Sequence, residues 1–211
     1  MAERPGYPLF SRLHPVLTRL REKRGDDEHR AELVAGLSGR VIEVGAGIGS
    51  NFRHYPSGVD EVVAIEPEPW LRERAEEAAE EAGVSISVVD GDAARLPGES
   101  GSFDAAVVSL TLCTVPDPEQ AIADLFRVIR PGGELRFFEH VIAERPALAR
   151  LQKVADATIW PHMIGGCHLA RDTKGNIEKA GFQIDACRRF PVSIAPFMLP
   201  EPHLLGVARR P

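Results

Sequence analysis

The sequence has few cysteines and no long apolar run. Its three cysteines, Cys113, Cys167 and Cys187, lie far apart and form no Cys-x-x-Cys pair, so neither a disulfide framework nor a zinc site is expected. No apolar stretch reaches the roughly 18 residues of a membrane span, and the first residues show no charged leader followed by an apolar block. These absences predict a soluble protein of a reducing cytoplasm, with no integral membrane segment and no bound metal.

The sequence also lacks a block of positive charge. Lys and Arg together number 25 against 31 Asp and Glu, which makes the net charge −6 at pH 7. Phosphate binding requires clustered cations, and the arginines here are scattered, so a nucleic-acid partner is not expected. With 211 residues, 44% of them hydrophobic, the chain can bury one sizeable core. The sequence leaves the oligomeric state open, a monomer included.

Short apolar runs that are typical of buried strands alternate with amphipathic helical stretches. Strands are predicted at residues 41–45, 61–66, 85–90, 103–110, 134–141, 182–190 and 203–209. Helices are predicted at residues 8–24, 27–37, 68–82, 118–130, 145–160 and 172–180. This alternation predicts an α/β fold: a doubly wound, seven-stranded, mostly parallel sheet with helices on both faces. Such sheets bind ligands at the carboxyl ends of their strands.

A glycine-rich segment, Glu43–Asn51, follows the first predicted strand. Glycine allows a sharp turn and lets a ligand approach a backbone that has no Cβ, and free amides at the next helix start favour a polar group. The pattern is E-x-G-x-G-x-G, with the third glycine one residue too early for the dinucleotide fingerprint G-x-G-x-x-G. The candidate cofactor-binding residues of this segment are Glu43, Gly45, Ala46, Gly47, Gly49 and Asn51.

An acidic residue, Glu66, ends the second predicted strand, and Pro67 follows it. A carboxylate at this place can accept hydrogen bonds from both hydroxyls of a ribose, as it does in nicotinamide-binding proteins. Alternatively, Glu66 caps the helix that begins near Pro67. We therefore treat Glu66 and Pro67 as candidate cofactor-binding residues.

Several motifs in order resemble the class I S-adenosylmethionine (SAM)-dependent methyltransferases. The glycine-rich segment resembles their motif I, and residues 91–97 resemble their GDA-x-x-LP segment. The resemblance implies that Asp92 binds the adenine amino group and that the amide of Ala93 reads a ring nitrogen, although Asp92 could equally lie in a solvated turn. It implies a Rossmann-like domain over residues 39–211 that uses SAM, yields S-adenosylhomocysteine and also contacts the cofactor through Ser109 and Leu110.

The distal half contains more specific strings, which are Leu112–Val115, Glu139–Val141, Trp160-Pro161, Gly166–Thr173 and Pro202-His203. They resemble the family that contains the mammalian alkyl-thiol methyltransferases and their bacterial relatives. The resemblance implies methyl transfer from SAM to a small thiol. Mammalian members begin with a hydrophobic anchor, whereas residues 1–30 here are charged and amphipathic, which argues against a membrane-borne acceptor.

Three alternatives to a thiol methyltransferase stay open. The acceptor could be an oxygen or nitrogen atom of a small metabolite or of a phospholipid head group. The chain could be a nicotinamide-dependent oxidoreductase, which the displaced third glycine disfavours. It could also bind SAM without catalysing methyl transfer.

Catalysis of thiol methylation requires alignment and the loss of the thiol proton. His140, at the end of the fifth predicted strand, is the candidate general base; alternatively it has a structural role. The helical extension of residues 1–38 is a candidate lid, or otherwise an ordinary surface helix. Candidate substrate-binding residues are Tyr7, His14, Cys113, Trp160, His168 and Arg171. Core packing is the alternative for Cys113 and Trp160, and helix capping is the alternative for the segment around His168 and Arg171.

Overall fold

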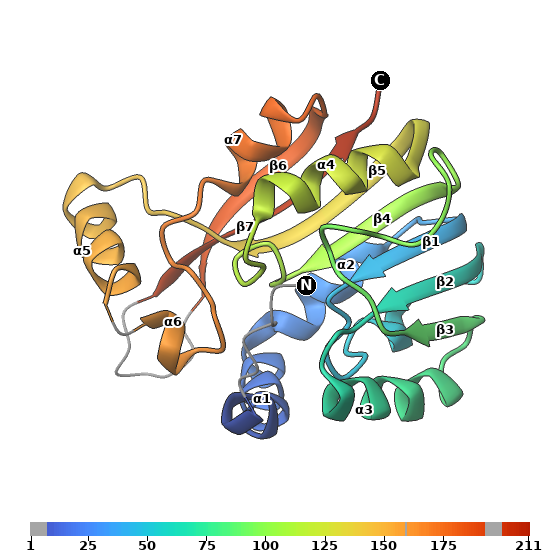
Figure 1. The fold of residues 1–211 in the computed structure, drawn as a ribbon, viewed down its shortest axis with the longest axis horizontal. Helices are drawn as coiled ribbons and strands as arrows, with labels where there is room; N and C mark the ends of the chain where they lie inside the picture. The colour runs from blue at the N-terminus through green and yellow to red at the C-terminus, as the bar shows by residue number, and fades with distance from the viewer. Residues whose placement is uncertain (1–7, 159, 193–199) are drawn as a thin grey trace.

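The computed structural model describes residues 8–158, 160–192 and 200–211, and its core is a seven-stranded sheet in the order β3-β2-β1-β4-β5-β7-β6. The strands are β1 Gly39–Val44, β2 Val59–Ile65, β3 Ile86–Val89, β4 Phe103–Ser109, β5 Ile129–His140, β6 Gln183–Val192 and β7 Glu201–Arg209. Strands β1 to β5 are parallel, and β7 runs antiparallel to both of its neighbours. The predicted doubly wound, mostly parallel sheet is confirmed (Figure 1).

Seven α-helices lie among the described residues. They are α1 Pro8–Arg21, α2 Asp27–Val34, α3 Pro69–Glu80, α4 Pro118–Val128, α5 Pro146–Asp156, α6 Trp160–Met163 and α7 Thr173–Lys179. A π-helical turn at Glu22–Asp26 joins α1 to α2, and a 3-10 turn spans Phe52–His54. Within the described part of the chain, no helix combines the length and apolarity needed to cross a bilayer.

The largest errors in the predicted boundaries concern α5 and β5. The single helix expected at residues 145–160 ends at Asp156, whose carboxylate accepts the backbone amides of Leu169 and Ala170 at 2.5 and 3.1 Å and so ties the end of α5 to the loop before α7. The fifth strand begins at Ile129 instead of residue 134. There the pairing register with β4 shifts, and Gly132 adopts a φ of +77° that few other residues tolerate.

Helix starts follow local side-chain chemistry. Asp117 accepts the amide of Gln120 at 2.9 Å ahead of α4, and Asp172 accepts the amide of Gly175 at 3.1 Å ahead of α7. Glu68 caps α3 by accepting the amide of Leu71 at 2.7 Å. The capping role that was the alternative for Glu66 therefore belongs to Glu68.

Apolar side chains pack on both faces of the sheet. Successive residues of a strand point to opposite faces, so Val41 packs with the α2 and α3 side while Ile42 packs with the α4 and α7 side. The strand ends converge at one edge, and Figure 1 shows the arrowheads of β1, β2 and β3 pointing to the side where α1 and α6 lie. The sheet therefore directs the loops after its parallel strands β1 to β5 toward the side where α1 and α6 lie.

Candidate active site

A cavity of about 670 Å³ lies at the carboxyl ends of β1, β2, β4 and β5, a size within the usual range of small-molecule sites. Its wall contains all but one of the predicted cofactor-binding residues, namely Glu43, Gly45, Ala46, Gly47, Asn51, Glu66, Pro67, Asp92, Ala93, Ser109 and Leu110. The exception is Gly49, where an added Cβ would lie 2.7 Å from Phe52 and 2.9 Å from Ala78. Gly49 therefore allows close packing behind the cavity wall.

The glycine turn keeps backbone atoms open to the cavity. Gly45 and Gly47 have φ values of +75° and +61°. A Cβ on Gly45 would lie 2.3 Å from Thr111 Oγ1, and a Cβ on Gly47 would lie 3.2 Å from the His14 ring. A side chain at Gly45 would thus strain the turn and collide with Thr111, and one at Gly47 would strain the turn and crowd the His14 ring.

Glu66 presents a buried carboxylate in this cavity. Its side chain accepts the amides of Gly47 at 2.8 Å and Glu68 at 2.9 Å, which hold it beside the glycine turn. Burial is the main reason that the pKa of Glu66 is raised to about 7, against the lowering effect of these two hydrogen bonds. The carboxylate is therefore positioned to accept further hydrogen bonds from ligand hydroxyls.

A second polar network lies under the glycine turn. Glu43 accepts hydrogen bonds from Asn51 Nδ2 at 2.8 Å and from the Tyr55 hydroxyl at 2.7 Å. Burial raises the pKa of Glu43 to about 7. Arg30 Nη1 donates to Asn51 Oδ1 at 2.9 Å and to Ser109 Oγ at 3.0 Å, which brings a cation from α2 into the cavity wall.

Sequence reasoning missed Arg30. It is only 8% exposed, and its Nε is buried without a hydrogen-bond partner among the described residues. A buried guanidinium with a spare donor is costly unless it meets an anion. The only possible sequence signal was one arginine in a short predicted helix. By sequence alone, a buried arginine in such a helix cannot be distinguished from a solvated arginine.

Asp92 lies in an exposed turn at the cavity wall. It lines the cavity with Ala93, and its Oδ1 accepts the amide of Ala94 at 3.0 Å in an exposed turn. The turn therefore holds the carboxylate at the edge of the cavity.

Glu139 fixes the loop that follows β4. Its buried carboxylate accepts the amides of Thr111 and Leu112, each at 2.9 Å, and of Cys113 at 3.1 Å. Leu110, at the start of this loop, has a φ of +57°, an uncommon conformation for a residue other than glycine. Glu139 therefore holds the loop that forms part of the cavity wall. Its neighbour His140 lines the cavity itself.

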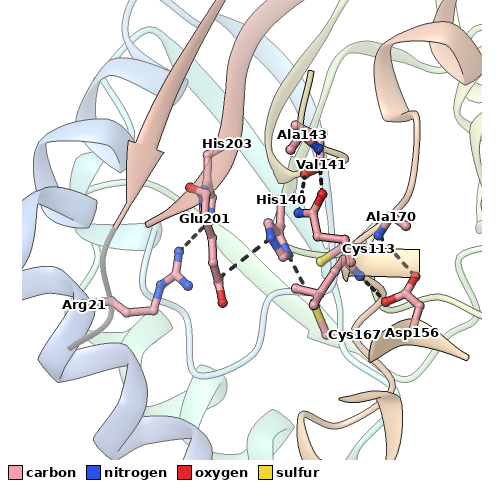
Figure 2. Close-up of polar contacts among 12 residues, drawn as sticks. Arg21, Cys113, His140, Val141, Ala143, Asp156, Cys167, Ala170, Glu201 and His203 are labelled. Atoms are coloured by element: carbon pink, nitrogen blue, oxygen red, sulfur yellow. Dashed lines mark hydrogen bonds and ion pairs between the residues drawn. The ribbon is translucent and has the colours of Figure 1, made fainter. Parts of the chain in front are cut away.

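His140 lies at the other end of the cavity, and Figure 2 shows its ring between Cys167 and Glu201. Its Nδ1 is 3.8 Å from Cys167 Sγ, and its Nε2 is 3.8 Å from Glu201 Oε2. Among the described residues Nε2 has no hydrogen-bond partner. Burial, followed by the charges of His203 and Arg21, lowers the pKa of His140 well below its usual value. The imidazole is therefore neutral at pH 7.

The neighbouring His203 has a defined tautomer. Arg21 Nη2 lies 3.0 Å from His203 Nε2, and an arginine can only donate. His203 Nε2 therefore accepts, and Nδ1 carries the proton that it donates to the Glu201 carbonyl at 2.9 Å. The rings of His140 and His203 stack with centroids 5.1 Å apart. Arg21 thus links α1 to the end of the cavity that is lined by His140, Cys167 and Glu201, hereafter called the acceptor end. No sequence pattern indicated this link.

The structure separates the predicted substrate-binding residues into two groups. His14, Cys113 and Trp160 line the cavity. His168 and Arg171 lie outside its wall, because the His168 ring is 3.5 Å from Asp156 and the Arg171 guanidinium binds the Leu112 carbonyl. Tyr7 lies outside the described residues.

Comparisons with known proteins agree with this geometry. A family model described as "Methyltransferase domain" matches residues 42–137. The thiol S-methyltransferase TMT1B of Homo sapiens is 32% identical over 181 residues, which are 83% of this chain and 73% of that protein. TMT1B of Mus musculus is 36% identical over 153 residues, 70% of this chain. The match spans 62% of the mouse protein's length.

Two further comparisons bear on the acceptor and on the fold. A phosphatidylethanolamine N-methyltransferase of Cereibacter sphaeroides is 32% identical over 122 residues, 57% of this chain and 60% of that protein. A crystal structure of a putative methyltransferase from Bacillus halodurans superposes with a TM-score of 0.74 at 17% identity. It covers 89% of this chain and 99% of that one, and it supports the fold alone.

Proposed function

Because the chain belongs to the family of class I SAM-dependent methyltransferases that includes the thiol S-methyltransferases, we propose that it methylates the sulfur of a small thiol. The observation that carries this proposal is the neutral, cavity-facing His140, whose Nε2 has no hydrogen-bond partner among the described residues. A neutral imidazole can accept a proton, and a thiol acceptor requires the removal of its proton.

The residues at the other end of the cavity fit SAM. The glycine turn lines the cavity at Gly45 and Gly47, where no Cβ lies between the backbone and a ligand, and Glu66 offers its carboxylate to the ribose hydroxyls. Asp92 and Ala93 would hold the adenine ring. Arg30, with its unpaired buried Nε, would bind the carboxylate of the methionine portion. When bound, SAM supplies an electrophilic methyl carbon on a sulfonium centre.

His140 acts in this proposal by removing the acceptor proton. A free thiol has a pKa of about 8.5, so most of it is protonated at pH 7. Proton acceptance at Nε2 requires the tautomer whose proton is on Nδ1, directed at Cys167 Sγ. A well-placed general base contributes about 10²–10⁴-fold in rate, and the depressed pKa of His140 favours the lower part of that range.

The N-terminal extension, residues 1–38, would act as a lid over the catalytic unit of residues 39–211. Support comes from α1, whose residues Ser11, His14, Leu17, Thr18 and Arg21 line the cavity. A segment in this position excludes water from the reacting atoms. A cytoplasmic location stays a prediction.

An amine acceptor is the second candidate. The carboxyl group of Glu201 lines the acceptor end beside His140, and an ionised carboxylate there would favour a cationic substrate. The similarity to a phosphatidylethanolamine N-methyltransferase supports the same alternative.

The test is methyl transfer from labelled SAM to alkyl and aryl thiols, catechols, amines and a phospholipid. We expect label on thiols alone. His140→Gln should lower kcat at pH 7 by about 10²-fold or more, and the deficit should shrink above pH 8.5 as the thiol ionises by itself. His162→Gln, which alters an exposed histidine of α6, is the matched control. Label only on oxygen or nitrogen would overturn the thiol assignment.

A further inference from the structure

Two cysteine residues line the acceptor end of the cavity. Cys113 belongs to the loop after β4 and Cys167 to the loop between α6 and α7, and both line the wall. The amide of His168 donates to the Cys113 carbonyl at 2.7 Å, which ties the two loops together. A hydrogen bond with the Cys167 thiol is the main cause, ahead of burial, of the raised pKa of Cys113. The two thiols therefore lie on neighbouring loops of the same cavity wall.

The surroundings of the two sulfurs differ. Cys167 Sγ is 3.8 Å from His140 Nδ1, and the opposite nitrogen of that ring faces Glu201 (Figure 2). Cys113 is only 2% exposed, whereas Cys167 is partly exposed. Cys167 therefore combines access from the cavity with a neighbouring proton acceptor, the combination that makes a thiol reactive.

We propose that Cys167 and Cys113 form a redox-active dithiol that exchanges with small disulfides entering the acceptor end of the cavity. Cys167 is the attacking thiol, His140 accepts its proton, and Cys113 is the resolving thiol. The proposal does not depend on which acceptor is methylated. Small disulfides are the oxidised form of small thiols, so this dithiol would report the oxidation state of such a pool.

The exchange proceeds in two balanced steps. The sulfur of Cys167 attacks a disulfide RS–SR while its proton passes to His140; the RS–SR bond breaks, and the leaving RS⁻ takes the proton from His140. The sulfur of Cys113 then attacks Cys167 in the mixed disulfide, and the second RS⁻ leaves with the Cys113 proton. In total the protein dithiol is oxidised to a disulfide, and RSSR is reduced by two electrons to two RSH.

The structure also orders the two steps. Exchange requires the thiolate, and the thiol of Cys113 is both covered and disfavoured from ionising. The first step should therefore be faster than the second, so that a mixed disulfide at Cys167 accumulates.

Proton acceptance at Nδ1 requires the tautomer with the proton on Nε2, the opposite of that used for methyl transfer. A neutral imidazole accepts one proton at a time. Disulfide exchange and base catalysis by His140 are therefore mutually exclusive at any instant.

The experiment uses the full chain, reduced and then mixed with 2-hydroxyethyl disulfide, and follows whole-protein mass and peptide maps over time. We expect one adduct on Cys167, then its loss as an internal Cys113–Cys167 disulfide forms, two hydrogens lighter than the reduced protein. Cys113→Ser should stop at the adduct. His140→Gln should slow adduct formation at Cys167 by about tenfold or more.

Cys187 provides an internal control, because it is exposed on β6 and outside the cavity wall. Its rate of modification in His140→Gln should equal that in the wild type, which separates loss of the base from loss of folding. The Cys187→Ser variant should form the internal disulfide as the wild type does. Reaction at Cys187 alone, modification of Cys113 before Cys167, or no internal disulfide in Cys187→Ser would each overturn the proposal.

Discussion

The raised pKa of Glu66 predicts that SAM binding depends on pH. In the ligand-free protein burial holds this pKa at about 7. Ribose hydroxyls donate hydrogen bonds, so the ionised carboxylate is the form that binds the cofactor. Affinity should therefore rise with pH through 7 and level off above it.

The magnitude follows from the pKa. One unit below its pKa, about a tenth of a carboxyl group is ionised, and each unit corresponds to about 1.4 kcal/mol. Between pH 8 and pH 6 we expect about a tenfold loss of affinity. The same shift acts on folding with a defined sign: a pKa raised from 4.5 to about 7 contributes stability that is complete below pH 4.5 and is lost as pH rises through 7.

The assay is calorimetric titration with S-adenosylhomocysteine at pH 6, 7 and 8, on the wild type and Glu66→Gln. Glu43 has a similarly raised pKa, but its titration is common to both proteins and cancels in the ratio of their Kd values. That ratio should change about tenfold over this range. Glu73→Gln, at an exposed position of α3, should behave as the wild type. Equal pH dependence in Glu66→Gln and the wild type would refute the assignment of Glu66.

Further substitutions test other parts of the structure. Arg30→Ala should weaken S-adenosylhomocysteine binding by about 1.5–3 kcal/mol, the range for a hydrogen bond to a charged group, whereas unchanged calorimetric affinity would remove Arg30 from the cofactor site. Gly45→Ala should lower the unfolding free energy in urea by more than Gly36→Ala, since both have positive φ but only the first meets Thr111; equal losses would count against crowding. Asp117→Ala should cost about 0.5–2 kcal/mol in the same urea titration through the lost helix cap, and no change would show that the cap contributes nothing.

The cofactor end of the site could be predicted because its signals are local. A strand, a glycine turn and a carboxylate at the next strand end are contiguous patterns, and the parallel sheet brings all such ends to one edge. The acceptor end could not be predicted in this way. Arg21 and Glu201 come from α1 and β7, and each is an ordinary charged residue in its own segment. At the cofactor end the same is true of Arg30 in α2.

The sequence alone determined the elements whose causes lie within a few residues. The alternation of apolar runs and helices specified the sheet and its helices, and Asp117 with Pro118 specified the start of α4. Only the tertiary structure determined the contacts between segments that are far apart in the chain. The carboxylate of Asp156, the last residue of α5, binds amides of the loop before α7. The insertion of β7 between β5 and β6 places Glu201 beside His140. This placement could not be predicted locally, because strand order, unlike helix capping, depends on pairing between residues far apart in the chain.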